Sequence, residues 1–477
     1  MRAQILVAIL LLSLVPVSAG TEGRAMTAEI VMQDRIWLSD EVVDVEVYVS
    51  GAPYNRNITL NWDLSDANGI IESDSIIFQM AGSTQIIPLD FSAYYSGENF
   101  YELEIEVSVD ANIVTDFMPF TVLRKSILPT ISNIIVFGDS LSDMGNAKDS
   151  ILNVPDVPPY WAGRFSNGEV WIEHVSDRFG INTTHGSGIS QGDNRAFGGS
   201  QTGQGYSYIL LPNTGTQINN YLTNVQSNIS SSELIFLWAG GNDFLYGTGN
   251  PDVISQNMAS HVRALALAGG TQFVVANLPP LEVTPEGASR STQQRATMAN
   301  DVVAYNNKLA IEMANLSNSM NIEITLIDAW TIFNEIVSKS EHVGITNTQD
   351  QACITSGTIL PLPICNSGDT VVSNEDEYLF FDKAHPTATM HRVIGEFAIE
   401  IIGDPDVDGD GIRDIDDQCE WTSDKSTVNV DGCDWSQQDE DGDNVSNGMD
   451  ECLETLLGYE VDTNGCADYQ RDTDGDG

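Results

Sequence analysis

A serine, a histidine and an aspartate stand where nucleophilic catalysis would need them. Ser140 lies in the segment 137–146 (FGDSLSDMGN), directly after an apolar run. A serine in such a turn can expose its hydroxyl at the edge of a sheet, with backbone N–H groups facing an anion. Asp382 and His385 are three residues apart, so the chain can fold back and bring the carboxylate to the imidazole Nδ1–H. That contact would fix the tautomer and leave Nε2 free to take a proton from serine.

Two more segments bring a glycine backbone and an amide side chain toward the serine. Residues 194–200 (NRAFGGS) offer a glycine backbone where a reacting group must approach closely. Residues 239–243 (AGGND) follow another apolar run and place the amide of Asn242 at the same sheet edge. A Gly-Asp-Ser tripeptide alone is weak evidence, because such tripeptides are common in turns. The four segments together make nucleophilic catalysis by Ser140, with His385 as base and Asp382 orienting it, a stronger prediction than the tripeptide alone.

The elements that must position these residues are buried strands alternating with helices. Short apolar runs alternate with segments of helical spacing; the runs are 134–137, 234–238, 273–276 and 324–327, and the helical segments are 253–267 and 296–316. Such alternation predicts a three-layer α/β parallel sheet over residues 130–403. Ligands bind at the carboxyl ends of the strands in these sheets, which is where the motifs fall.

The four segments resemble the GDSL, or SGNH, hydrolase family of esterases and lipases, in its FGDSLSD-x-GN variant. They occur in the family's order, and residues 158–168 (PPYWAGRFSNG) and 277–280 (NLPP) match as well. The resemblance implies a flavodoxin-like fold, with Ser140 as nucleophile, His385 as general base and Asp382 as its orienter. Catalysis in this scheme needs no metal.

The resemblance also implies three oxyanion donors. They are the N–H of Ser140, the N–H of Gly199 and the side chain of Asn242. Gly198 stays open as an alternative to Gly199, because the loop has two adjacent glycines. Ser200 stands where relatives often carry alanine.

The implied activity is hydrolysis of carboxylic esters, either lipid or small acyl esters, through an acyl-enzyme. The alternatives within the fold are a phospholipase or acyltransferase and a carbohydrate O-acetyl esterase. An alternative from another class is a calcium-dependent surface binding protein whose hydrolase domain is inactive. The intact set of motif residues argues against that reading.

The stretch before the hydrolase segments alternates between apolar and polar residues. Valines occupy every second position over 43–49, and leucine, isoleucine and valine do so over 103–109. A period of two predicts strands with one buried face, so we expect an all-β, immunoglobulin-like sandwich over 22–128. It contains no catalytic constellation.

The first nineteen residues are typical of a secretory signal. Arg2 is followed by an apolar run over 5–15 and by small residues at 17–19, where cleavage is expected. We therefore expect an extracellular protein that can form disulfides. Its flanking parts could contact a cell surface or matrix.

The composition narrows the classes of partner. The 477 residues include 69 acidic and 20 basic side chains, which gives a formal net charge of −49. This charge repels phosphate backbones, so nucleic-acid binding is excluded as a function. With 42% hydrophobic residues, the chain can form true cores.

The last 74 residues, 404–477, repeat with a period of 33. Cys419 corresponds to Cys452, and Cys433 to Cys466. Alternate aspartates in each unit have the spacing of a calcium loop; the candidate ligands are Asp406, Asp408, Asp410 and Asp417, then Asp439, Asp441, Asp443 and Asp450. Asn444 replaces the loop glycine in the second unit. A third unit begins at 472 and stops at 477, so we expect the natural chain to continue.

This tail resembles short thrombospondin type 3 repeats. The resemblance implies Ca²⁺ as a structural ion and disulfides Cys419–Cys433 and Cys452–Cys466. The alternative is a solvated acidic tail. Cys353 and Cys365 close a small loop and are expected to form a third disulfide.

Several other residues of the hydrolase segments receive structural interpretations. Asp139 and Asp243 are expected to hydrogen-bond their own loops, and His174 to pack in a helix. Tyr160 and Trp161 are interpreted either as lining the substrate site or as ordinary packing.

Overall fold

The structure is a computed structural model. It describes residues 25–39, 41–93, 95, 99–124, 127–129, 131–186, 192–208, 210–225, 228–355, 364–406, 410–412, 417–419, 422, 427–456 and 458–471. The expected signal sequence and the expected third acidic unit lie outside these residues. The chain divides into two compact units, one of Met1–Gln33, Val43–Phe91 and Glu102–Met118, and one of Asp34–Val42, Ser92–Tyr101 and Pro119–Gly477. Each is described by itself.

The N-terminal region is rich in β-structure. One sheet has the order β1 (Thr27–Met32), β3 (Val42–Ser50), β6 (Thr84–Ser92), and the other has the order β2 (Ile36–Leu38), β8 (Asn112–Leu123), β7 (Phe100–Val109), β4 (Ile58–Asp66), β5 (Gly69–Phe78). The alternate apolar residues of β3 and β7 are buried and their neighbours mostly exposed, as the period of two predicts. Trp62 of the second sheet stacks on Phe91 of the first, with ring centroids 5.7 Å apart, so buried faces of the two sheets meet.

The larger unit is built on a parallel sheet. Its order is β10 (Asn133–Gly138), β13 (Glu233–Trp238), β14 (Gln272–Ala276), β15 (Glu323–Ile327), and all three pairings are parallel. These strands coincide with the four apolar runs of the sequence. Nearly all their apolar side chains are buried, which is why the strands are continuously apolar rather than alternating.

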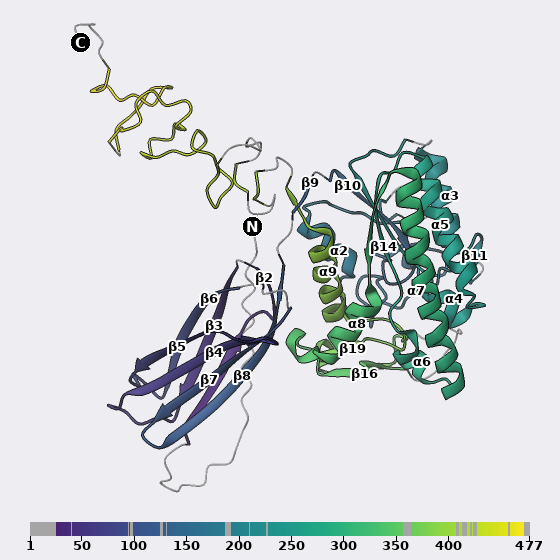
Figure 1. Ribbon diagram of the computed structural model, residues 1–477, viewed down its shortest axis with the longest axis horizontal. Coiled ribbons are helices and arrows are strands. Elements are labelled where there is room, and N and C mark those ends of the chain that lie inside the picture. The colour runs from purple at the N-terminus through teal and green to yellow at the C-terminus, as the bar shows by residue number, and fades with distance from the viewer. Residues whose placement is uncertain are drawn as a thin grey trace. The chain divides into compact units, whose positions relative to one another are not determined.

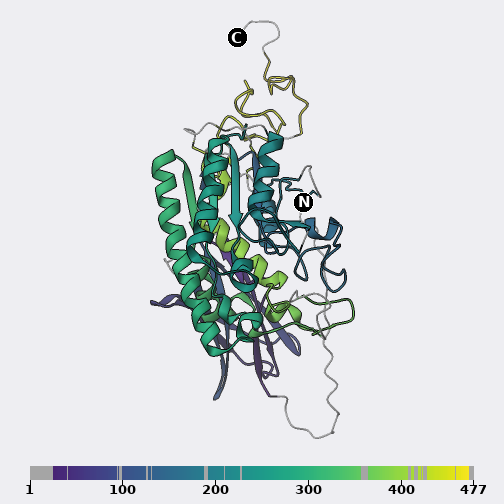
Figure 2. The same cartoon turned by 90° about the vertical axis from the view of Figure 1, so that its right-hand side faces the viewer.

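Helices cover both faces of this sheet (Figures 1 and 2). One layer contains α3 (Thr214–Val225), α5 (Pro251–Leu267) and α7 (Thr292–Met320); the other contains α2 (Trp171–Arg178) and α9 (Ala388–Ile402). α5 packs on α7, and α2 packs on α9. This is the three-layer α/β architecture expected from the sequence.

Shorter elements complete the unit. The remaining helices are α1 (Asn146–Asp149), α4 (Gly241–Tyr246), α6 (Pro285–Ala288) and α8 (Ala329–Ser338), with 3₁₀ turns at Leu281–Val283, Ser340–Val343 and Glu375–Glu377. The remaining strands are β9 (Ile127–Pro129), β11 (Tyr206–Ser207), β12 (Leu211–Pro212), β16 (Asn347–Gln351), β17 (Cys353–Ile354), β18 (Thr370–Val371), β19 (Tyr378–Phe380) and β20 (Asp404–Asp406).

The acidic tail repeats in structure as well as in sequence. Disulfides join Cys419 to Cys433 and Cys452 to Cys466. The hydroxyls of Thr422 and Thr455, 33 positions apart, lie within hydrogen-bond distance of equivalent groups, namely a half-cystine carbonyl, a glycine carbonyl and a glutamine side chain. The described tail is therefore a folded array held by short local contacts.

Among the described residues, no helix combines the length and the apolar character needed to span a bilayer.

Candidate active site

Ser140 follows the carboxyl end of β10 and contacts a histidine from the far end of the unit. The Oγ atom of Ser140 lies 2.8 Å from Nε2 of His385, although the two residues are 245 positions apart. Both residues are buried, at 7% exposure each. The structure therefore brings the expected serine and histidine into hydrogen-bond contact.

Asp382 holds the other side of the imidazole. Its Oδ2 and Oδ1 lie 2.7 and 2.9 Å from His385 Nδ1. Oδ1 also accepts the backbone N–H groups of Ala384 and His385, at 2.8 Å each. These two N–H bonds fold the segment back on itself, which is the conformation that the three-residue spacing predicts.

Asn242 stands in the first turn of α4, beside Ser140 in a common pocket. That pocket is lined by Asp139, Ser140, Leu141, Phe165, Gly199, Gly241, Asn242, Leu245, Tyr246, Leu281, Ile364, Ala384 and His385. The Asn242 Nδ2 atom donates to the carbonyl of Ser200 at 3.0 Å and lies 3.4 Å from Asp139 Oδ2. One amide hydrogen is thus firmly held, and the other has only a long contact that a better acceptor could replace.

The two adjacent glycines of the 194–200 loop differ in what their N–H groups do. The N–H of Gly198 donates to Asp143 Oδ2 at 2.8 Å, so it is already used. In the described part of the chain, the N–H of Gly199 has no acceptor, and Gly199 lines the pocket with Ser140. Gly199 has φ +75°, and a Cβ there would lie 2.6 Å from the Tyr208 ring, so the position requires glycine. This arrangement favours Gly199 over Gly198 as the donor.

Asp143 ties the serine loop to the glycine loop. Besides Gly198, it accepts the N–H groups of Gly145, Asn146 and Ala147 at 2.6–3.1 Å. Burial raises its pKa to about 6, and these N–H groups oppose that rise. Sequence reasoning did not single out Asp143, although it lies within the serine motif.

Two more buried carboxyl groups border the site. Asp139 accepts the N–H of Leu141 in its own loop, as expected. Asp243 instead accepts the N–H and hydroxyl of Thr202, 41 positions away, so it joins two loops rather than bonding its own. Burial raises the pKa of Asp139 to about 7 and that of Asp243 to about 6. Of these two, only Asp139 lines the pocket, and near pH 7 its carboxyl is only partly ionised.

Tyr160 is not among the residues that line this pocket. Its side chain is 1% exposed, and its hydroxyl donates a hydrogen bond to Asp382 Oδ2. Trp161 is 42% exposed. The expected disulfide between Cys353 and Cys365 is present.

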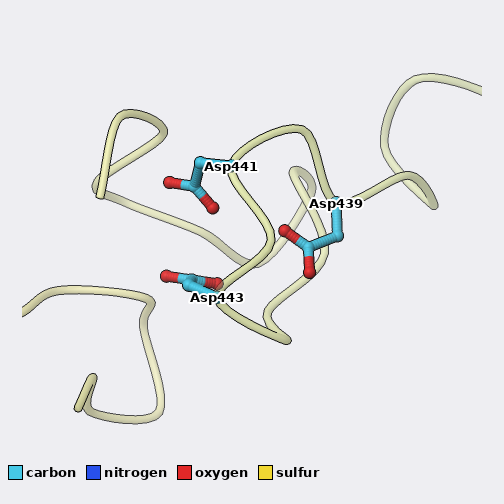
Figure 3. A group of neighbouring side chains, drawn as sticks. All are labelled: Asp439, Asp441 and Asp443. Atoms are coloured by element: carbon cyan, nitrogen blue, oxygen red, sulfur yellow. The ribbon is translucent and has the colours of Figure 1, made fainter. Parts of the chain in front are cut away.

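The second acidic unit gathers its carboxylates. Oxygens of Asp439, Asp441 and Asp443 lie within 4.8 Å of one another (Figure 3). Partial burial and the neighbouring carboxylates of Asp441, Asp450 and Asp439 raise the pKa of Asp443. Asp441 Oδ1 and Asp443 Oδ2 are shielded from solvent and have no hydrogen-bond partner among the described residues. Asn444 has φ +71°, as its place in the loop requires.

The first acidic unit is described less completely. Asp410 and Asp417 are described, whereas Asp408 and the side chain of Asp406 lie outside the described residues. One close approach recurs in both acidic units. A Cβ at Gly432 would lie 2.0 Å from Asp417 Oδ1 in the first unit, and a Cβ at Gly465 would lie 2.0 Å from Asp450 Oδ1 in the second. The twelfth-position aspartates therefore sit equivalently in both loops.

The family model of the GDSL-like lipases and acylhydrolases matches residues 134–398, more than half of the chain. The chain belongs to this family. Ser140, Gly199, Asn242, Asp382 and His385 all lie within the matched segment of this GDSL-family protein.

Three relatives illustrate the range of activities within the family. The phosphatidylcholine-sterol acyltransferase of Aeromonas hydrophila is 24% identical over 324 residues, covering 59% of this chain and 93% of that protein. The thermolabile hemolysin of Vibrio parahaemolyticus is 28% identical over 280 residues, covering 57% and 63%. A GDSL esterase/lipase of Arabidopsis thaliana is 24% identical over 346 residues, covering 62% and 95%. The chain is thus an acyl-ester hydrolase or acyltransferase by family.

Among solved structures, a CARDB domain from Pyrococcus furiosus aligns with 22% of this chain and 97% of its own length. The identity is 13% and the TM-score 0.17, and this likeness carries no argument about the fold.

A second pocket of this GDSL-family protein adjoins the first and is apolar. The two share Asp139, Leu141, Gly241, Leu281 and Ala384. The second is otherwise lined mainly by aliphatic and aromatic side chains at the ends of the strands and on α8 and α9, including Leu278, Ile327, Ala329, Ile332, Phe333, Phe380, Met390 and Ile394. An apolar space beside the serine can accommodate a hydrocarbon group.

Proposed function

We propose that this chain is a secreted serine hydrolase that cleaves carboxylic esters through a Ser140–His385–Asp382 triad. The observation that carries the proposal is the continuous hydrogen-bond path from Ser140 Oγ through the imidazole to the buried carboxylate. A nucleophile on a base that is itself oriented by a third group is the arrangement that activates serine.

The reaction proceeds in two halves. Ser140 Oγ attacks the ester carbonyl while His385 Nε2 takes the serine proton. The imidazolium returns that proton to the leaving alcohol as the carbon–oxygen bond breaks, which leaves an acyl group on Ser140. Water then attacks the acyl-enzyme, with His385 again serving as base, and releases the acid.

The oxyanion of each tetrahedral intermediate is held by three donors. They are the N–H groups of Ser140 and Gly199 and the Nδ2–H of Asn242, three residues that line one pocket. The amide of Asn242 turns one hydrogen from its long contact with Asp139 to the oxyanion. The two backbone N–H groups are fixed before reaction and stabilise the charge without reorganisation.

The apolar pocket beside Ser140 supports an ester with a hydrocarbon acyl chain rather than an acetyl group. This favours a lipase-like esterase over a carbohydrate O-acetyl esterase. Transfer of the acyl group to another alcohol instead of water stays the second candidate, because one relative is named an acyltransferase.

The tail would bind Ca²⁺ as a structural ion, in the manner of thrombospondin type 3 repeats. The converging oxygens of Asp439, Asp441 and Asp443, two of which lack a hydrogen-bond partner among the described residues, suit a hard cation that takes oxygen ligands. Asp450 completes the second loop. The expected ligands of the first are Asp406, Asp408, Asp410 and Asp417. The tail and the N-terminal strands would serve contact with a cell surface or matrix.

Hydrolysis of p-nitrophenyl esters from acetyl to palmitoyl tests the enzymatic proposal, with wild type beside Ser140→Ala. We expect serine-dependent turnover with an optimum beyond acetyl. An optimum at acetyl would favour the O-acetyl esterase. Folded wild-type protein without turnover at any chain length would favour the binding-protein alternative.

A further inference from the structure

The catalytic carboxylate proposed above has one partner that the triad scheme does not use. Each oxygen of Asp382 faces His385 Nδ1, and Oδ1 also accepts two backbone N–H groups. Oδ2 has one more donor, the hydroxyl of Tyr160. Asp382 is 0% and Tyr160 1% exposed, so water does not compete for this contact.

Tyr160 remains a donor at any working pH. Burial and the adjacent carboxylate of Asp382 raise the pKa of the Tyr160 hydroxyl well above its usual value. The ring is held edge-on by Phe381, at 5.1 Å between centroids, and by Phe165, at 6.2 Å. Phe165 also packs on the imidazole of His385 at 5.1 Å. The phenol therefore has little freedom to turn away.

A disulfide fixes the hydroxyl of Tyr160 from the other side. The backbone N–H of Cys365 donates to Tyr160 Oη at 2.8 Å, and Cys365 is bonded to Cys353. The N–H of Cys353 donates to the carbonyl of Phe381, the residue before Asp382, at 2.7 Å. One end of the disulfide thus holds the tyrosine, and the other holds the backbone beside the carboxylate.

We propose that Tyr160 is a positioning residue for the catalytic carboxylate, and that the Cys353–Cys365 disulfide keeps it in place. The inference rests on the proposed triad. The phenol O–H holds Asp382 Oδ2 against the imidazole Nδ1–H and withdraws part of the carboxylate charge. A carboxylate that shares its charge with the phenol stabilises an imidazolium less than a free carboxylate does.

Other ionisable groups interact with His385 and Asp382. A test must distinguish the titration of those groups from the effect of Tyr160. Asp139 and His391 interact electrostatically with His385, and Tyr246 does so with Asp382. Asp139 is the one whose raised pKa, about 7, falls in the range of an activity profile. The pH profiles are therefore measured in wild-type and Asp139→Asn backgrounds.

The first test is Tyr160→Phe, which removes the hydroxyl and keeps the ring. We expect kcat to fall about 10- to 100-fold, the factor typical for loss of the hydrogen-bond partner of a metal-binding side chain, with KM nearly unaltered. The acidic limb of the kcat profile should move to higher pH, because the carboxylate regains charge and stabilises the imidazolium. The shift should persist in the Asp139→Asn background.

The matched control is Tyr221→Phe. Tyr221 is another buried tyrosine of the same unit, and among the described residues its ring contacts Phe137 and no member of the triad. We expect this variant to keep the wild-type kcat and pH profile. A Tyr160→Phe variant with wild-type kcat, or with a lower kcat and an unshifted acidic limb, would overturn the inference.

The second test is the pair Cys353→Ala/Cys365→Ala, made alone and together with Tyr160→Phe. Alone, it should lower kcat about threefold or more and shift the limb in the same direction; together with Tyr160→Phe, it should add little, because both act on the same contact. Additive losses would refute the role of the disulfide. If Tyr160→Phe does not fold, the Cys353→Ala/Cys365→Ala variant alone decides. An acidic limb of its kcat profile that does not move to higher pH would then overturn the inference.

Failure of the proposed function gives a different result. Turnover that survives Ser140→Ala would disprove the proposed triad, whatever activity Tyr160→Phe shows. Turnover that is lost in Ser140→Ala but unaltered in Tyr160→Phe would remove only the positioning role.

Discussion

The amide of Asn242 has one hydrogen available for a developing negative charge. Loss of one oxyanion donor typically lowers kcat by about 10²–10³. We therefore expect Asn242→Ala to lose activity by roughly that factor while unfolding at the wild-type temperature. The exposed Asn219→Ala is the control and should match wild type in both measurements. Wild-type kcat in Asn242→Ala would remove this residue from the site.

The buried carboxyl of Asp139 makes stability depend on pH. Its folded pKa is about 7, whereas its reference value is 3.8. Between these values the unfolded chain releases the proton and the folded protein keeps it. The stabilisation is therefore complete below about pH 4 and is lost as the pH rises to about 7.

Asp139→Asn should abolish that part of the pH dependence, a difference of roughly 4 kcal/mol between pH 4 and pH 7 at most. Urea unfolding at a series of pH values measures it, with the exposed Asp350→Asn as control. Parallel curves for Asp139→Asn and wild type would contradict the raised pKa.

The spacing of residues made part of the site predictable. An aspartate three residues before a histidine can bond it locally, so the Asp382–His385 contact follows from sequence. The choice between Gly198 and Gly199 does not, because it depends on the Asp143 carboxylate 55 positions away. Tyr160 lies 222 positions from Asp382, and no local pattern links the two.

At the scale of elements, the length of the apolar runs and the turn signals between them are sufficient to predict the strands of the parallel sheet. The four apolar runs form β10, β13, β14 and β15, because strands that are buried on both faces carry apolar residues at nearly every position. The apolar pocket was not predictable. It forms where side chains from strand ends, α8 and α9 fail to fill the space between them, which depends on tertiary packing.

That pocket gives a prediction about acyl-chain length. Ala329 lines the apolar pocket at the start of α8 but not the pocket that contains Ser140. Ala329→Leu should shift the optimum among p-nitrophenyl esters to shorter chains and leave acetyl-ester turnover unaltered, because the added atoms occupy the far space. Val303→Leu, exposed on α7, serves as control and should keep the wild-type optimum. An unchanged optimum in Ala329→Leu would place the acyl chain elsewhere.

At the scale of the whole molecule, the tail concentrates negative charge. Carboxylates packed as closely as those of Asp439, Asp441 and Asp443 repel one another without a cation. Removal of Ca²⁺ with a chelator should therefore speed proteolysis of the tail and leave ester turnover nearly unaltered. The variant Asp441→Asn/Asp443→Asn should be cleaved rapidly even with Ca²⁺ present. Loss of turnover on chelation would contradict the separation of tail and active site.

The repeat of 33 residues makes the contacts within the tail predictable, since identical residues at equivalent positions form equivalent contacts. The division of the chain into compact units was less predictable from the sequence. The described strands of the N-terminal region contribute residues to both units, whereas alternation along the sequence marks only which residues are strands.

The central claim is that Ser140 is the nucleophile of an acyl-enzyme. Intact mass after treatment with an alkyl fluorophosphonate, followed by peptide mapping, tests it most directly. The account predicts one adduct on wild type, located on Ser140, none on Ser140→Ala, and much slower labelling of His385→Ala. An adduct on another residue, or equal labelling of Ser140→Ala, would contradict it.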